Sequence, residues 1–133
     1  MIPAMNAQPS SSATHRQLHP QALLIEPDPA ARQLCRIVLQ GIGFSVREAD
    51  VGVAAAIAAR ERTPDLILLA YQLPDVSGQQ AIGWLRSNPS LQTTPIIIMA
   101  EIRKEGSIVE PDVLLHKPLT ATTLGRTIRT AMK

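Results

Sequence analysis

The sequence predicts an α/β fold in which helices cover both faces of a parallel sheet. Short apolar runs, typical of buried strands, alternate along the chain with longer helical segments, and this alternation is typical of parallel sheets. The chain has 133 residues, of which 45% are apolar and only 2% are aromatic. These numbers predict a single core built from Leu, Ile, Val and Ala, which suits buried strands beneath Ala-rich helices.

The expected elements follow one another without an internal repeat. We predict strands at Ala22–Ile25, Ser45–Glu48, Leu66–Ala70, Ile96–Ala100 and Val113–Leu115. We predict helices at Pro29–Gln40, Val51–Arg60, Ser77–Ser87 and Thr120–Lys133. Asp28 and Thr120 are suitable N-caps, and Gly41 is the expected end of the first helix.

The start of the chain differs in composition from the rest. Residues 1–20 are rich in Ser, Pro, Ala and Gln and show no apolar period, so we expect a disordered tail there and the folded domain at residues 21–133. His15 and His19 lie in this tail and are too few to predict a metal site.

The composition argues against several functional classes. The net charge is +2 and the longest basic cluster, Arg103-Lys104, is flanked by glutamates, so no nucleic-acid partner is predicted. No apolar run is long enough to cross a membrane, and residues 1–20 lack the pattern of a secretory signal. The single cysteine, Cys35, excludes an internal disulfide and fits a cytoplasmic protein. On its aliphatic helix, Cys35 is expected to be a small buried hydrophobe.

Four segments carry a resemblance to a known family, namely ALLIEPDPAARQL, TPDLILLAYQLPDVSG, TPIIIMA and DVLLHKPL. Their order and spacing resemble those of bacterial response-regulator receiver domains, the phosphoryl-accepting modules of two-component signalling, over residues 21–133. The resemblance implies a flavodoxin-like, doubly wound, five-stranded parallel sheet with helices on both faces.

The resemblance also implies a site at the C-terminal edge of the sheet, where open α/β folds bind ligands. In the family, two acidic residues hold Mg²⁺, an Asp accepts the phosphoryl group, and a hydroxyl residue and a Lys hold its oxygens. The residues at these positions here are, in order, Glu26, Pro27, Ala70, Ala100 and Lys117. Lys117 is the one clear survivor, so we predict a degenerate pocket with no catalytic residue, no metal and no cofactor.

Alternatives to this assignment remain open. With a shifted register, Asp65 or Asp75 would be the acceptor, although neither ends a strand. We expect Lys117 to form a structural ion pair with Glu26, and its alternative role is that of a residual anion-binding group. His116 is adjacent to Lys117, but no nucleophile is present for it to activate.

The segment between Ala100 and Lys117 is shorter than in typical receivers and contains the helix breakers Gly106 and Pro111. We therefore expect the family's fourth helix to be shortened or absent. Trp84, on a predicted helix, is a candidate interface anchor because large aromatic residues often anchor interfaces. The candidate interaction surface comprises Trp84, Ile102, Ile108, Leu114 and Leu119.

Together these positions predict a stand-alone pseudo-receiver, not an enzyme, that acts in signal transduction by phosphorylation-independent protein–protein interaction. No output domain is expected after Lys133. The expected partner is another signalling protein, namely a histidine kinase, a response regulator or a regulatory protein, and a homodimer is a further option. Two alternative functions remain: a receiver phosphorylated at an unorthodox carboxylate, and a small-ligand sensor that uses the pocket at the sheet edge.

Overall fold

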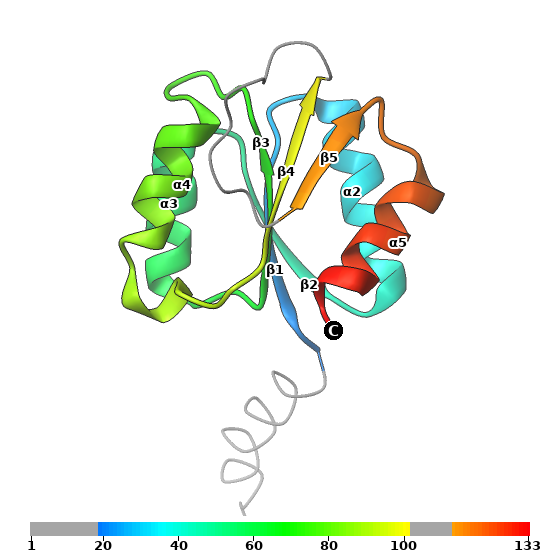
Figure 1. The fold of residues 1–133 in the computed structure, drawn as a ribbon, viewed down its shortest axis with the longest axis horizontal. Coiled ribbons are helices and arrows are strands. Elements are labelled where there is room, and N and C mark those ends of the chain that lie inside the picture. The colour runs from blue at the N-terminus through cyan, green and yellow to red at the C-terminus, as the bar shows by residue number, and fades with distance from the viewer. Residues whose placement is uncertain (1–18, 102–112) are drawn as a thin grey trace, which may run out of the picture.

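The computed structural model describes residues 19–101 and 113–133, which contain one five-stranded parallel sheet. The strands lie in the order β2-β1-β3-β4-β5 (Figure 1). Their bounds are β1 Gln21–Ile25, β2 Ser45–Ala49, β3 Leu66–Ala70, β4 Ile96–Glu101 and β5 Val113–Lys117. This strand order is that of flavodoxin-like doubly wound folds, so the predicted fold class is confirmed.

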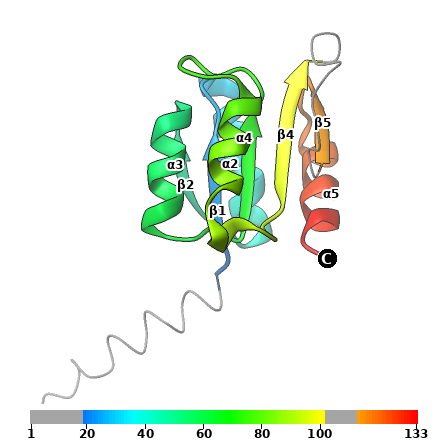
Figure 2. The same ribbon diagram turned by 60° about the vertical axis from the view of Figure 1, so that its left-hand side comes forward.

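Helices cover both faces of the sheet (Figures 1 and 2). The helices α2 (Pro29–Ile42) and α5 (Ala121–Ala131) lie side by side on one face, and α3 (Gly52–Glu61) and α4 (Gly78–Arg86) lie side by side on the other. A short 3-10 helix, η1 (Pro89–Leu91), follows α4. No helix in the described part of the chain is long and apolar enough to cross a membrane.

The alternation of side chains along the strands divides the core into two layers. The strands β1 and β3 are buried along their whole length because helices cover both of their sides. In β1, Leu23 and Ile25 pack towards α3 and α4, whereas Ala22 and Leu24 pack towards α2 and α5. Each helix pair therefore has its own aliphatic layer, and the sheet separates the two layers.

Both N-caps predicted from the sequence are confirmed. The Asp28 carboxylate accepts a hydrogen bond from the N–H of Ala31 at 3.0 Å, at the start of α2. The Thr120 hydroxyl accepts one from the N–H of Thr123 at 3.1 Å, at the start of α5. Each cap satisfies a backbone donor that the helix itself leaves unpaired.

The predicted boundaries of helices and strands agree well with the structure, and the largest differences are two residues, at the C-terminal ends of α2, β5 and α5. The prediction that α2 ends at Gly41 is wrong: the helix continues to Ile42 and stops at Gly43, whose φ is 126°. Glycine adopts such a φ without the steric cost that a side chain brings, which makes Gly43 the better stop signal.

Two expectations concern segments outside the described residues. The predicted tail falls almost entirely in residues 1–18, and the segment expected to lack the family's fourth helix is residues 102–112. The expectation of a missing helix was imprecise as a count, because the described residues contain four α-helices besides η1. For the segment between β4 and β5, it remains a prediction.

Candidate functional site

The C-terminal ends of the strands meet at one edge of the sheet, where the sequence places its candidate site. A cavity of about 200 Å³ at this edge is lined by Glu26, Pro27, Ala100 and Lys117, together with other residues. Ala70 is the last residue of β3, and the next residue along the chain lines the same cavity. The structure thus gathers at one edge the five positions that the resemblance selected from four separate segments.

Glu26 and Lys117 form an ion pair at this edge of the sheet. The Lys117 ammonium nitrogen, Nζ, lies 2.8 Å from Oε1 of Glu26, as the sequence analysis expected. The Glu26 side chain is only 1% exposed and the Lys117 side chain 25% exposed. The strands that carry the pair, β1 and β5, are separated by β3 and β4. The pair therefore bridges the ends of the two strands that carry Ala70 and Ala100.

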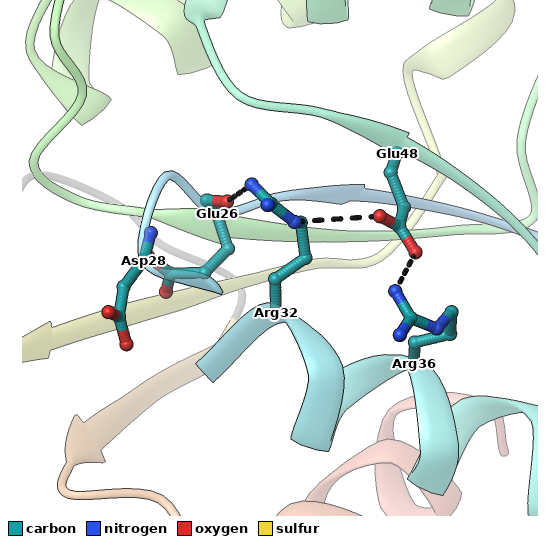
Figure 3. Close-up of polar contacts among 5 residues, drawn as sticks. All are labelled: Glu26, Asp28, Arg32, Arg36 and Glu48. Atoms are coloured by element: carbon teal, nitrogen blue, oxygen red, sulfur yellow. Dashed lines mark hydrogen bonds and ion pairs between the residues drawn. The ribbon is translucent and has the colours of Figure 1, made fainter. Parts of the chain in front are cut away.

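Backbone and arginine contacts hold Glu26 in place (Figure 3). Its second carboxylate oxygen, Oε2, accepts a hydrogen bond from the N–H of Asp28 at 3.0 Å. The Arg32 guanidinium donates a hydrogen bond to the Glu26 backbone carbonyl at 2.9 Å. Oε1 takes no aligned hydrogen bond in the described residues, so the ammonium at 2.8 Å is the group that balances its buried charge.

A second ionic cluster, which the sequence analysis missed, ties α2 to β2 (Figure 3). The Glu48 carboxylate lies 2.7 Å from Nη1 of Arg36 and 3.5 Å from Nε of Arg32. The two arginines are one helical turn apart on α2, so they reach the same carboxylate. Arg32 therefore contacts both the backbone of the candidate site and the edge strand.

The remaining positions of the site offer little chemistry. Ala70 and Ala100 are 2% and 3% exposed, and a methyl group can neither attack nor accept a phosphoryl group. Pro27 has no side-chain oxygen, and both oxygens of Glu26 are already engaged. Mg²⁺ requires several oxygen ligands in octahedral arrangement. Asp28 and Glu101 also line the cavity, but the Asp28 carboxylate caps α2, and the described residues contain no group of three or more acidic, His or Cys side chains that could hold a metal ion.

The carboxylates that a shifted register would select lie elsewhere. The Asp65 carboxylate accepts a hydrogen bond from the N–H of Gln21, the first residue of β1, at 2.7 Å. Because the strands are parallel, the start of β1 lies at the edge opposite the cavity. Ala70 is the last residue of β3, as predicted, and its assignment to the acceptor position of the family remains a prediction.

Asp75 has a structural partner that the sequence analysis did not foresee. Its two carboxylate oxygens accept hydrogen bonds from the N–H groups of Gly52 at 2.8 Å and Val53 at 3.0 Å, at the start of α3. These bonds hold the pKa of the Asp75 carboxyl below its usual value. The loop packs so closely that a Cβ on Gly52 would lie 2.5 Å from a methyl carbon of Val76.

Cys35 is buried as predicted and lies beneath the site. Its sulfur is 3.7 Å from the sulfur of Met99, a residue that lines the cavity. Burial raises the pKa of the Cys35 thiol to about 12, with a further contribution from the Glu26 charge and a partial offset from Lys117. The thiol therefore stays protonated at neutral pH and acts as an apolar side chain.

The residues of the candidate interaction surface have different surroundings. Trp84 is 40% exposed on α4. Leu114 is half-buried against the α3/α4 layer of the core, and Leu119 is half-buried against the α2/α5 layer. His116 is exposed on β5. Ile102 and Ile108 lie outside the described residues.

Comparison with known families agrees with this fold. The model of the response regulator receiver domain matches residues 22–129, so the chain belongs to that family. Members of the family are signalling modules that interact with kinases and other signalling proteins. The chain is thus a receiver domain of two-component signalling.

Individual response regulators and receiver domains are similar to this chain in sequence or in structure. It is 31% identical to the polar-differentiation response regulators DivK of Brucella ovis and Brucella abortus over 84 residues, which is 63% of this chain and 68% of each relative. The chemotaxis response regulator CheY4 of Vibrio cholerae matches with a TM-score of 0.79 and 24% identity, covering 85% of this chain and 98% of that one. The receiver domain of the sensor histidine kinase PA1611 from Pseudomonas aeruginosa, solved with magnesium in its active-site cleft, matches with a TM-score of 0.78 and 23% identity, covering 86% and 98%. These structural likenesses show the fold.

Proposed function

We propose that this receiver domain acts by binding another signalling protein without taking up a phosphoryl group. The observation that carries the proposal is Ala70, which ends β3 at the edge where the family's phosphoacceptor belongs. A methyl group there removes the nucleophile of the reaction. Signalling then depends on contacts of the folded domain with its partner, which fits a histidine kinase, a response regulator or a regulatory protein.

The charges at the site support the same proposal. In a working receiver site the lysine is available to balance a phosphoryl group. Here Lys117 already balances the carboxylate of Glu26, which is almost fully buried. A phosphoryl group would have to displace this carboxylate and leave a buried negative charge without a counter-ion, which is strongly unfavourable.

Phosphorylation at Asp28, Asp75 or Glu26 is less favoured because each of these carboxylates has a structural role. The Asp28 carboxylate caps α2, and the Asp75 carboxylate caps α3. Glu26 is buried in its ion pair with Lys117. A small-ligand sensor is also less favoured, since the cavity of about 200 Å³ is below the roughly 300–1,000 Å³ of common ligand sites.

The intact mass of the protein tests the proposal directly. The protein is incubated with Mg²⁺ and acetyl phosphate, beside the triple variant Pro27→Asp/Ala70→Asp/Ala100→Thr, which restores the family's residue types. We expect no added phosphoryl mass on the natural protein. A stoichiometric gain of one phosphoryl group on an Asp or Glu of the natural protein would overturn the proposal.

Binding provides the second half of the test. A receiver that works without phosphorylation binds its partner with the same Kd whether or not acetyl phosphate and Mg²⁺ are present. The natural protein is titrated against sensor kinases and response regulators of its source organism by isothermal calorimetry under both conditions. A partner that binds only in the presence of the phosphoryl donor contradicts the proposal.

A further inference from the structure

The outward side of α3 is apolar although it faces solvent. Val53 is 47% exposed and Ile57 50% exposed, and the two residues lie four positions apart on the same side of the helix. The other side of α3 is also apolar, with Ala55 and Ala59 buried against the sheet. A surface helix normally carries polar residues on its outer side, and a helix that is apolar all round is usually covered.

A groove with a mixed polar and apolar lining connects this face of α3 to α4. The groove has a volume of about 280 Å³ and lies between the C-terminal halves of the two helices, with Ala56, Arg60 and Trp84 among its lining residues. Trp84 is 40% exposed. Arg60 is the one charged residue among the described residues that line it. Val53, Ile57 and Trp84 are large apolar side chains exposed on neighbouring helices, and clusters of exposed apolar side chains mark sites of protein association.

We propose that a second copy of this chain covers the outward face of α3, with the two α3 helices antiparallel around a two-fold axis. An axis midway between Val53 and Ile57 places each of these residues opposite the other residue of the second copy. The same axis brings Arg60 of each chain towards Asp50 of the other, because Asp50, two residues before α3, and Arg60, in its last turn, are each five residues from the midpoint in sequence. One two-fold interface then repeats each contact twice.

Charge complementarity is what favours a second copy over another occupant. Asp50 and Arg60 are both exposed, and neither forms an ion pair with another described residue. Asp50 lies two residues before the first residue of α3 and Arg60 lies in the last turn of the helix, so an antiparallel copy brings opposite charges together on both sides of the apolar centre. Glu61, at the C-terminal end of α3, then lies near the positive N-terminal end of the copy's helix. The apolar centre and the charged ends are therefore self-complementary.

The proposal is independent of the proposed function and is tested by self-association. Sedimentation velocity of the natural protein from about 1 μM to about 1 mM covers dissociation constants in the range of weak dimers. We expect a reversible monomer–dimer equilibrium. A monomer at every concentration overturns the proposal, including the case in which an unrelated protein binds the same face.

A matched pair of variants locates the interface. Ile57→Asp places a charge at the centre of the proposed interface and is expected to raise the dimer Kd by about tenfold or more. The control is Ile37→Asp, because Ile37 is 57% exposed on α2, on the other side of the molecule. Circular dichroism checks that both variants fold. An equal loss of dimer in the two variants contradicts an interface on α3.

A charge exchange tests the antiparallel arrangement itself. The variants Asp50→Arg and Arg60→Asp each place like charges opposite one another, so each is expected to weaken the dimer. The double variant Asp50→Arg/Arg60→Asp restores opposite charges and recovers the Kd of the natural protein. A mixture of the two single variants is expected to form heterodimers for the same reason. Dimers that weaken in both single variants but are recovered neither in the double variant nor in the mixture would overturn the antiparallel pairing.

Discussion

The two helix pairs of this domain cover opposite faces of the same sheet but present different surfaces to solvent. On one face, α2 and α5 contain four arginines and no acidic residue. On the other, α3 presents Val53 and Ile57 to solvent. The inward sides are both aliphatic, so the core does not require this difference. Core formation thus constrains only the inner side of a helix. The residues on the outer side depend instead on whether solvent or a partner protein contacts it.

The largest predicted effect tests whether the two layers contribute equally to stability. Leu23 and Leu24 are neighbours in β1, both fully buried, and pack into opposite layers. We expect Leu23→Ala and Leu24→Ala each to lower the free energy of unfolding by about 2–5 kcal/mol, since each removes buried surface and leaves a cavity. Urea unfolding measures both. A loss below about 1 kcal/mol at one position would mean that its layer is loosely packed.

The next largest effect concerns the ion pair between Glu26 and Lys117, at the C-terminal edge of the sheet. Lys117→Met leaves the Glu26 carboxylate buried without a counter-ion, whereas Glu26→Gln leaves a lysine that is 25% exposed and can reach water. Because Lys117 is partly exposed and water can reach the site, we expect Lys117→Met to cost about 1–3 kcal/mol of unfolding free energy, as for an unsatisfied buried acceptor, and Glu26→Gln to cost less.

The double variant Glu26→Gln/Lys117→Met measures the interaction energy between the two side chains apart from their contacts with other groups. Because both charges are removed together, its cost should be smaller than the sum of the two single costs. Chemical unfolding of the four proteins at one pH gives the coupling. Simple additivity would show that the two side chains do not stabilise each other.

A smaller effect concerns Asp75, whose carboxylate caps the start of α3. Hydrogen bonds from the N–H groups of Gly52 and Val53 lower the pKa of the Asp75 carboxyl. A lowered folded-state pKa adds stability that is fully present above the ordinary Asp value of about 4 and is lost as the pH falls through the folded-state pKa. We expect Asp75→Asn to be less stable at neutral pH and to lose less stability on acidification.

The acid limb of the stability curve is the relevant measurement for Asp75. Thermal unfolding is followed between neutral pH and the acid range for the natural protein, Asp75→Asn and the control Asp50→Asn. The control removes an exposed carboxylate for which the described residues show no backbone hydrogen bond, and all three proteins are compared at a concentration at which the natural protein is monomeric. Identical acid limbs for all three proteins would show that Asp75 does not stabilise α3.

The smallest predicted effect compares the solvent-facing sides of α2 and α3. Ile37→Lys on α2 and Ile57→Lys on α3 change side chains that are both about half exposed. At micromolar concentration, we expect each to change the free energy of unfolding by no more than about 0.5 kcal/mol, as is usual for surface positions. A large loss at Ile57 alone, in a protein shown to be monomeric, would assign its side chain to the fold instead of to an interface.

Local patterns were enough to predict most of the fold. The strand Leu66–Ala70 was placed with the observed bounds because five apolar residues lie between a Pro-Asp pair and a polar loop. Asp28 was identified as a cap because an N-cap acts on the first turn that follows it. The stop at Gly43 was missed because two glycines lie within three residues, and only the backbone geometry shows which of them has the positive φ.

The candidate site was predictable where position in the family's pattern fixes it, and not where a contact depends on long-range packing. Glu26 and Lys117 were paired because both fall at the carboxyl ends of strands. The cap of α3 by Asp75 could not be foreseen, because the carboxylate comes from a loop more than 20 residues away in sequence. The Arg32 contact with the Glu26 carbonyl likewise requires the three-dimensional position of α2.

The bridge between Glu26 and Lys117 has an evolutionary consequence. Ala70→Asp alone would place a second carboxylate beside a buried pair in which one ammonium already serves one carboxylate. Pro27→Asp alone would add negative charge without an acceptor to use it. Restoring the family's residue types one at a time is thus expected to be unfavourable until the others are present, so the substitutions are epistatic. Under the proposed function, single mutations therefore do not readily give this domain a working phosphotransfer site.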